Sequence, residues 1–153
     1  MKIGFIGTGN MASAIIKGIV KEQFIQAEDI YLFDVMTEKV QELSQEIGAN
    51  ACMSNLELLD TVDAVVLSVK PNIVEKVLLE AKETILDKRP LIISIAAGTP
   101  TEKLYGFLQT KEEIPVVRVM PNVNAMIGKG AAAVCGNTFA SEEQIEYVFC
   151  LLY

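Results

Sequence analysis

The chain has 153 residues, 51% of them hydrophobic, which is enough for one compact domain with a full core. Its 13 basic and 20 acidic side chains give a net charge of −7 without a basic run, which argues against nucleic acid and anionic membranes as partners. It has no apolar segment of about 20 residues for a membrane span, and no histidine for general-base or metal chemistry.

The first 20 residues predict a strand, a tight turn and a helix. Lys2 to Ile6 is a short apolar run, and apolar residues recur at helical spacing from Ala12 to Ile19. Between them, Gly7-Thr8-Gly9-Asn10-Met11-Ala12 fits the G-x-G-x-x-G/A dinucleotide fingerprint. Gly7 would permit the turn, Gly9 would let a pyrophosphate approach the backbone, and Ala12 would let the helix pack close to the strand. We therefore expect a diphosphate on the free amides of a helix that begins near Asn10.

The same segment has two other possible interpretations, a turn that binds nothing and a secretory signal. A glycine turn that binds nothing is the simpler one, and the position of the motif between a strand and a helix argues against it. A secretory signal is the other, because Lys2 precedes an apolar stretch with small residues. It is rejected because glycines and Asn10 interrupt that stretch.

A second strand, Ile30 to Phe33, ends at Asp34, about 22 residues beyond Ala12. This is close to the spacing at which a carboxylate binds the adenosine ribose of a dinucleotide. The alternative is an N-cap or loop residue, because a helix with Val40 and Leu43 on its apolar face follows. A 2′-phosphate ~4 Å from Asp34 would cost up to roughly 4 kcal/mol per unit charge near a protein surface, so charge favours NADH over NADPH.

The next elements are a short strand, a brief helix and a buried strand. Ala49 to Met53 is the third predicted strand, and Ser54-Asn55 opens the helix. Asn55 is either the cap of this helix, which the sequence favours, or a polar contact to the adenine side of a cofactor. Val62 to Val69 is almost continuously apolar, which is typical of a strand buried on both faces of a parallel sheet.

Lys70-Pro71 follows this fourth strand, at the edge where open α/β sheets bind their ligands. Pro71 suits the first position of a helix. Lys70 is either a solvated surface charge or part of a nicotinamide-ribose pocket.

Leu91 to Ile95 is the fifth predicted strand, and Ala96-Ala97-Gly98 follows it. These small residues leave room for a ring against the backbone, or form a simple tight turn. Thr99-Pro100-Thr101 begins a helix, and Val116 to Met120 is a sixth strand. Because strands and helices alternate, we predict a doubly wound parallel sheet, the Rossmann dinucleotide-binding fold, in the order 3-2-1-4-5-6.

Beyond Asn122 the alternation of strand and helix patterns is less regular. Gly128 and Gly130 flank a predicted loop, Ala131 to Cys135 could be one more strand, and Ser141 begins a helix without a stop signal. We therefore expect a dinucleotide-binding domain over residues 1–140. Residues 141–153 would start a helix that leads toward an absent carboxyl-terminal domain.

The three cysteines, Cys52, Cys135 and Cys150, are far apart and form no C-x-x-C pair. They indicate reduced thiols of a cytoplasmic protein, more typical of buried than of catalytic cysteines. With no histidine present, no catalytic residue and no metal ligand set is predicted within the chain, and a cofactor is expected to carry the chemistry.

Four motifs together resemble one family. I-G-F-I-G-T-G-N-M-A-S-A-I at the start, S-V-K-P at Ser68 to Pro71, S-I-A-A-G at Ser94 to Gly98 and R-V-M-P-N at Arg118 to Asn122 are similar, in order and spacing, to the amino-terminal domain of the pyrroline-5-carboxylate reductases. The resemblance covers almost the whole chain. It implies a reductase that passes hydride from NADPH or NADH to the C=N bond of 1-pyrroline-5-carboxylate, giving L-proline in proline biosynthesis.

The resemblance also implies a set of cofactor contacts. It strengthens the expectation that Asn55 and Lys70 contact the cofactor. Many members carry a small polar residue in place of Asp34, so the departure here puts an NADPH preference in doubt. The implied cofactor-binding residues are Ile6, Gly7, Thr8, Gly9, Asn10, Met11, Asp34, Asn55, Ser68, Val69, Lys70, Pro71, Ile95, Ala96 and Ala97.

The family's second domain is a helical dimerisation module that binds the substrate, and nothing in this chain matches it. The resemblance therefore implies a fragment that holds the cofactor and is inactive alone, within a full-length homo-oligomer. Two alternatives stay open: a related oxidoreductase of the β-hydroxyacid or F420-dependent type, and a non-catalytic regulatory paralogue that binds nucleotide.

Overall fold

The computed structural model describes residues 1–96, 98–121 and 132–151. The strands are β1 (Ile3–Ile6), β2 (Ile30–Phe33), β3 (Asn50–Ala51), β4 (Ala64–Leu67), β5 (Leu91–Ser94), β6 (Val116–Pro121) and β7 (Ala132–Gly136). The helices are α1 (Asn10–Lys21), α2 (Thr37–Ile47), α3 (Asn55–Thr61), α4 (Pro71–Glu80), α5 (Lys82–Lys88), α6 (Thr101–Phe107) and α7 (Glu142–Leu151), with a 3₁₀ turn η1 (Ala27–Asp29).

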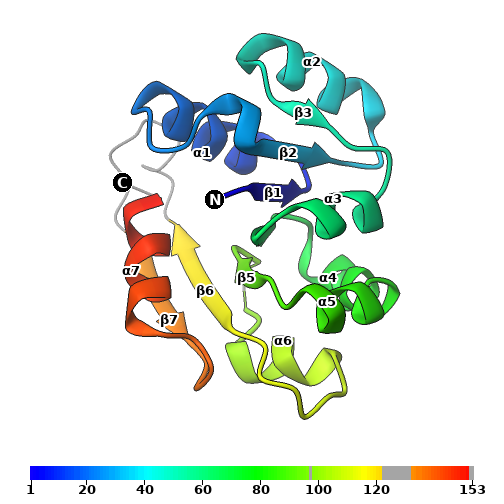
Figure 1. Cartoon of the computed structure of the whole chain (residues 1–153), viewed down its shortest axis with the longest axis vertical. Helices are drawn as coiled ribbons and strands as arrows, with labels where there is room; N and C mark the ends of the chain where they lie inside the picture. Colours follow the sequence, from blue (N-terminus) through cyan, green and yellow to red (C-terminus); the bar gives the residue numbers. More distant parts are fainter. Residues whose placement is uncertain (97, 122–131, 152–153) are drawn as a thin grey trace.

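The described strands form one sheet in the order β3-β2-β1-β4-β5-β6-β7. Strands β1 to β6 pair in parallel, which confirms the predicted doubly wound sheet and its order 3-2-1-4-5-6. In Figure 1, β2 and β3 lie above β1, whereas β5 and β6 lie below it. The chain thus reverses its direction across the sheet at β1, and ligands of such sheets bind at this switch point.

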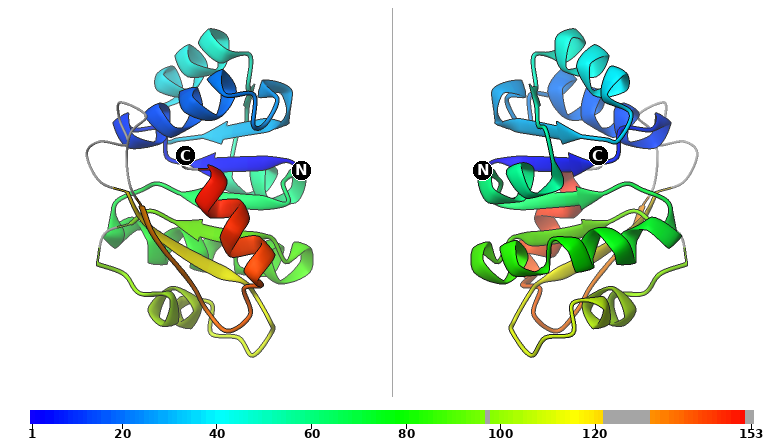
Figure 2. Two further views of the ribbon diagram at one scale, coloured as in Figure 1. Left: turned by 90° about the vertical axis from the view of Figure 1, so that its left-hand side faces the viewer. Right: turned by 90° about the vertical axis from the view of Figure 1, so that its right-hand side faces the viewer.

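Side chains alternate between the two faces along each strand, and here both faces carry apolar side chains. Helices therefore cover both faces of the sheet. Ile3 and Phe5 of β1 enter a core shared with α1, α2 and α7, whereas Ile6 enters the opposite core with α3, α4, α5 and α6. Figure 2 shows α7, in red, in front of the sheet in one view and behind it in the opposite view, where the green helices α3 to α5 come forward.

Gly4 brings α3 unusually close to the middle of the sheet. A Cβ atom at this position would lie 2.3 Å from Cδ2 of Leu58, a fully buried residue of α3. The lack of a side chain on Gly4 therefore allows α3 to pack directly against β1. No feature of the sequence marks this glycine as a packing position.

The sheet ends in an antiparallel pair that the sequence pattern did not specify. The predicted strand Ala131 to Cys135 corresponds to β7, which pairs with β6 in antiparallel register. The predicted start of α7 is confirmed as a capping box. The amide of Gln144 donates to Oγ of Ser141 (3.1 Å), and the amide of Ser141 donates to Oε1 of Gln144 (2.9 Å).

Several strands are shorter than predicted. The third is reduced from Ala49–Met53 to Asn50–Ala51, the fourth from Val62–Val69 to Ala64–Leu67, and the fifth from Leu91–Ile95 to Leu91–Ser94. Among the described strands, β3 pairs with β2 alone, at the edge of the sheet. Helix α5 was not predicted, because in its seven residues only Ile85 is buried and the apolar period is too short to recognise.

The prediction that the cysteines are buried is correct for one of three. Cys52 is buried, and burial together with the Glu57 carboxylate raises the pKa of its thiol to about 11. Cys135 and Cys150 are exposed, because they lie on the outward sides of the edge strand β7 and of α7. A thiol with the pKa of Cys52 is protonated at neutral pH and is a poor nucleophile.

Helix α7 packs onto the sheet through Val148 and Leu151, both of which lie in the core shared with α1 and α2. The domain boundary after residue 140 remains a prediction. Ala97, Asn122, the loop with Gly128 and Gly130, and Ala131 lie outside the described residues. In the described part of the chain, no helix is both long enough and apolar enough to span a membrane.

Candidate dinucleotide-binding site

Three neighbouring strands end at the same level of the sheet. Ile6, the last residue of β1, pairs with Phe33 of β2 and with Leu67 of β4. The next residue of each strand, Gly7, Asp34 or Ser68, therefore lies at the carboxyl edge beside the switch point. This juxtaposition builds the candidate site.

The backbone conformation and the neighbouring atoms both require a glycine at position 7. Its φ is +103°, which L side chains rarely adopt, and a Cβ atom here would lie 2.7 Å from the carbonyl oxygen of Ser68. Its amide donates to the carbonyl oxygen of Phe33 at 2.8 Å. The prediction that Gly7 permits the turn is confirmed, and its amide is used inside the protein.

Ser68 holds the same turn from the other side. Its hydroxyl lies 2.7 Å from the carbonyl oxygen of Gly7 and 3.0 Å from that of Ile6, and its amide donates to Ile6 at 2.9 Å. A hydroxyl has one hydrogen, so it donates to one of these carbonyls at a time. Ser68 thus contacts the glycine turn directly.

Asp34 is bonded to the glycine turn and is not the N-cap of α2. Its Oδ2 accepts hydrogen bonds from the amide and hydroxyl of Thr8 (2.8 and 3.1 Å), and its Oδ1 accepts one from the amide of Met36 (3.0 Å). The capping interpretation is wrong, because the chain enters α2 two residues later, with Met36 as the N-cap. Burial acts to raise the pKa of Asp34, but the bonds from Met36 and Thr8 and the charge of Lys39 outweigh it and lower the pKa.

Gly9 differs from Gly7, because nothing in the described protein requires a glycine there. Its φ of −69° and ψ of −174° suit any residue, and no protein atom lies within 4 Å of a Cβ atom placed on it. It is the N-cap of α1 and is exposed. The absence of a side chain leaves the backbone open toward solvent.

The first amides of α1 are unpaired. Among the described residues, none accepts a hydrogen bond from the amides of Gly9, Asn10, Met11 or Ala12, and α1 has no side-chain cap. Ala12 is buried against the sheet, as expected for the last position of the fingerprint. Free amides and the positive end of a helix dipole form a site for an anion.

Helices α1 and α4 share a feature that distinguishes them from the other described helices. Neither has an acidic residue in its first turn, whereas each of the others has at least one. They follow β1 and β4, the two strands at the switch point. The first turns of these two helices therefore carry no carboxylate that would repel a diphosphate.

Asn55 is not a helix cap, which corrects the interpretation favoured by the sequence. Ser54 takes the cap position of α3 with extended backbone, and its hydroxyl accepts from the amide of Glu57 at 3.1 Å. Asn55 is the first helical residue, and its Oδ1 is buried without a hydrogen-bond partner among the described residues. A buried acceptor without a partner is costly, so this amide is available for a ligand.

Four apolar side chains near Asp34 and Asn55 are exposed, and the sequence analysis did not assign them to the site. Val35 and Met36 follow β2, with exposed fractions of 86% and 55%, and Met53 (85%) and Leu56 (49%) surround the start of α3. The signal present in the sequence was three apolar residues in loops after strands, Val35, Met36 and Met53, whereas Leu56 is the second residue of α3. Such side chains suit a flat aromatic ring such as adenine.

The remaining predicted residues lie along the same edge, beyond β4 and β5. Lys70 is exposed and is the N-cap of α4, and Pro71 occupies the first turn as predicted. Val69 and Ile95 are half-buried, and the amide of Ile95 donates to Leu67 at 3.2 Å. Ala96 is buried, and its amide donates to Oγ of Ser94 at 3.2 Å.

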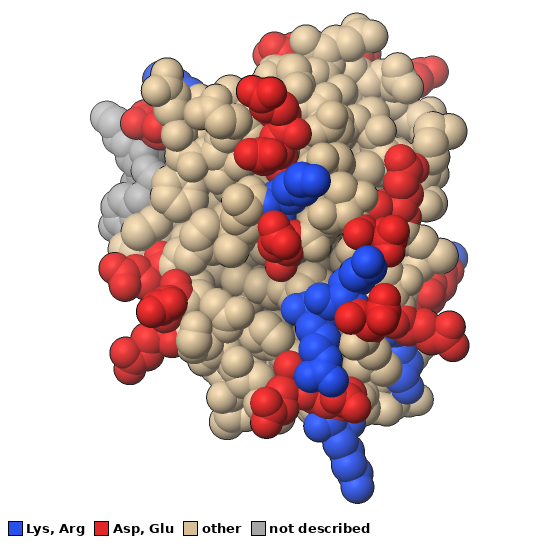
Figure 3. All heavy atoms as spheres, in the orientation of Figure 1, with Lys and Arg blue, Asp and Glu red and all other residues tan. Residues whose placement is uncertain are grey.

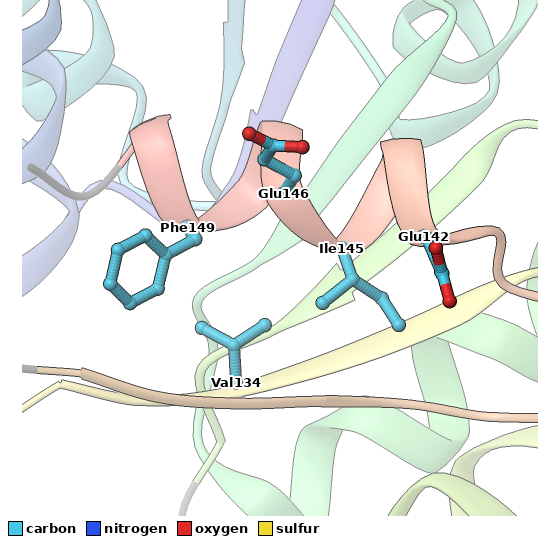
Figure 4. Close-up of a pocket in the computed structure, with 5 residues that line it drawn as sticks. All are labelled: Val134, Glu142, Ile145, Glu146 and Phe149. Atoms are coloured by element: carbon cyan, nitrogen blue, oxygen red, sulfur yellow. The ribbon is translucent and has the colours of Figure 1, made fainter.

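Other surfaces are less suited to a dinucleotide. On the face shown in Figure 3, basic side chains lie among acidic ones. An apolar groove between α7 and β7 is lined by Val134, Ile145 and Phe149 and bordered by Glu142 and Glu146, whose carboxylates repel anions. Figure 4 shows Ile145 extending toward Val134 and Glu146 pointing away from the strand. Among the described residues no cluster of metal-ligating side chains is found.

Comparison with known proteins supports the motif-based resemblance. Residues 2–98 match the family described as NADP oxidoreductase coenzyme F420-dependent. The chain is 35% identical over 142 residues to pyrroline-5-carboxylate reductase of Escherichia coli (strain K12), covering 93% of this chain and 52% of that protein. It therefore spans about half the length of the curated relatives it matches.

Two solved structures have the same fold over almost the whole chain. The pyrroline-5-carboxylate reductase from Coxiella burnetii is similar with a TM-score of 0.91 and 26% identity, covering 99% of this chain and 55% of that one. The Plasmodium falciparum pyrroline carboxylate reductase, solved with NADP bound, gives a TM-score of 0.84 and 30% identity over 99% of this chain and 54% of that one. The chain belongs to the NADP oxidoreductase coenzyme F420-dependent family, and its resemblance to the amino-terminal half of pyrroline-5-carboxylate reductases is confirmed.

Proposed function

We propose that this chain binds NADPH or NADH at the carboxyl edge of β1, β2 and β4. The observation that carries the proposal is the row of unpaired amides from Gly9 to Ala12, beside a glycine that no protein contact requires. A diphosphate fits such amides because they supply hydrogen bonds and a positive helix dipole. The Plasmodium relative with bound NADP supports the same ligand class.

The rest of the edge suits the two nucleosides of such a cofactor. Asp34, the free Oδ1 of Asn55 and the exposed apolar side chains around them suit an adenosine. The segment Ser68–Pro71 and the residues Ile95 and Ala96, on the other side of β1, would face the nicotinamide end. Ile6 and Met11 would support the turn from the core, while Gly7 and Thr8 shape it without free amides of their own.

We further propose that the full-length protein is a pyrroline-5-carboxylate reductase, because the relatives at 30–35% identity carry that name. The residues named above would hold the dinucleotide, which would supply the hydride that reduces the C=N bond of the protonated imine. This half of the protein orients the cofactor and excludes water from one side of it. A second domain would supply the substrate site and the homo-oligomer contacts, and free cysteines fit a cytoplasmic location.

The test is NAD(P)H oxidation by the full-length protein with 1-pyrroline-5-carboxylate. We expect turnover with this imine, formation of proline, and no turnover by residues 1–153 alone, which still bind the cofactor. A regulatory paralogue predicts binding without turnover. An F420-dependent enzyme predicts that reduced F420 serves as the electron partner, so a parallel assay with that coenzyme separates the two oxidoreductase classes.

Cofactor preference gives a prediction at Asp34. We expect Asp34→Ser to shift the NADPH/NADH affinity ratio toward NADPH by about tenfold, because ~1.4 kcal/mol of relieved repulsion lies well within the roughly 4 kcal/mol per unit charge at ~4 Å. Calorimetric titration with both cofactors measures the ratio. Glu46→Gln, at the far end of α2 in an exposed ion pair with Lys17, is the matched control and should leave the ratio unchanged. An unaltered ratio in Asp34→Ser would refute the charge argument.

A further inference from the structure

The carboxylate of Asp34 is largely occupied before any ligand arrives. It accepts two hydrogen bonds from Thr8 and one from the amide of Met36. A carboxylate offers about four lone-pair positions, so about one is left. A ribose presents two hydroxyls to such a residue, and Asp34 can accept from only one of them without breaking an internal bond.

Asp34 is also one of the internal anchors of the segment that leads to the unpaired amides. Along the turn, the amide of Gly7 is bonded to Phe33, and both the amide and the hydroxyl of Thr8 are bonded to Asp34. Thr8 is only 4% exposed, whereas Gly9, the next residue, is exposed and makes no internal contact through its amide with any described residue. From the side of α1, the carbonyl oxygens of Thr8 and Gly9 accept hydrogen bonds from the hydroxyl (3.2 Å) and the amide (2.9 Å) of Ser13. The amides of Asn10 to Ala12 follow the axis of α1, so the position of Thr8 bears chiefly on the amide of Gly9.

We propose that Asp34 contributes to cofactor binding chiefly as a positioning residue, which holds Thr8 and thereby the adjoining amide of Gly9, and only secondarily through the ribose. This inference rests on the proposed dinucleotide function. It assigns to Asp34 an effect on the diphosphate, which lies on a different part of the ligand from the ribose.

The two contributions separate when the ribose hydroxyls are removed from the ligand. The probes are ADP and 2′,3′-dideoxy-ADP, titrated calorimetrically into the wild-type protein and into Asp34→Asn. Asparagine has one acceptor oxygen and no charge, so its bonds to Thr8 are either lost or no longer charge-assisted, whichever way the amide is turned. We expect Asp34→Asn to bind both ligands about tenfold more weakly, the scale of losing one charge-assisted hydrogen bond. Any effect of the lost charge acts on both ligands alike.

A loss confined to ADP would overturn the inference, because it would place the effect of Asp34 at the ribose. The absence of a loss with either ligand would overturn it as well. Failure of the wild-type protein to bind ADP and NADH would instead overturn the proposed function, and the inference with it. Thermal unfolding without ligand checks that the variant folds.

Variants at Thr8 test the same contact without changing the charge. Thr8→Val lacks the hydroxyl bonded to Asp34, and we expect it to lower the affinity for both ligands about threefold. Thr8→Ser keeps the hydroxyl and should bind both ligands like the wild type. In the Asp34→Asn background, Thr8→Val should add less than this threefold loss, because the hydroxyl that it removes then faces a weaker acceptor or none. Fully additive losses, or no rescue by serine, would contradict the positioning role.

Discussion

Gly9→Val is expected to weaken NADH and NADPH binding at least about 100-fold while the protein stays folded. The space around a Cβ atom at Gly9 is empty of protein, and its backbone angles suit any residue. A valine there would occupy the volume through which a diphosphate approaches the first amides of α1. Losing two charge-assisted hydrogen bonds at about 1.5 kcal/mol each amounts to about 3 kcal/mol, or roughly 100-fold in affinity.

The same substitution at Gly18 is the matched control. Gly18 lies on the exposed side of α1, also without a protein atom within 4 Å of its Cβ position, and away from the start of the helix. Gly18→Val should bind both cofactors like the wild type, and both variants should unfold cooperatively. If Gly9→Val retained wild-type affinity in calorimetry, the diphosphate could not lie on these amides.

The sequence predicts the frame of this site because its signals are local. The G-x-G-x-x-A spacing, the strand before it and the helical repeat after it all lie within 20 residues. The alternation of strands and helices predicts a doubly wound sheet, and the dinucleotide fingerprint in its first turn favours the order 3-2-1-4-5-6. The level ends of β1, β2 and β4, which place Gly7, Asp34 and Ser68 together, follow from that order.

The partners of polar side chains could not be predicted in the same way. Asp34 at a strand end indicates an acceptor, but its bonds to Thr8 join residues 26 positions apart and depend on the exact path of two loops. Ser54 and Asn55 are both good caps, so the sequence leaves the first residue of α3 uncertain by one position, and that position decides whether the Asn55 amide is free.

Close approaches between distant elements were also beyond the sequence pattern. Gly4 reads as an ordinary residue of an apolar strand, and its importance comes from Leu58, which occupies the place of its missing side chain. Such contacts depend on how far a helix settles onto a sheet. That distance is set by packing over the whole face rather than by the residues near Gly4.

An alanine at Gly7 and an alanine at Gly9 should lower the free energy of unfolding by clearly different amounts. We expect Gly7→Ala to destabilise the protein by roughly 2–5 kcal/mol, from the left-handed backbone and from overpacking. The added methyl group would meet the carbonyl oxygen of Ser68 at 2.7 Å and its carbonyl carbon at 2.8 Å, and backbone atoms cannot move aside as a flexible side chain can.

Gly9→Ala is the comparison that isolates this cause, because it adds the same methyl group two residues away in open space. Its cost should stay near the ~1 kcal/mol or less of a poorer N-cap. Urea unfolding of the two variants and the wild type gives both free energies, with ligand absent. Equal destabilisation by the two alanines would contradict the distinction. If only Gly7→Ala is strongly destabilised, the glycine at position 7 is required by the fold, and the one at position 9 is left to be explained by the ligand.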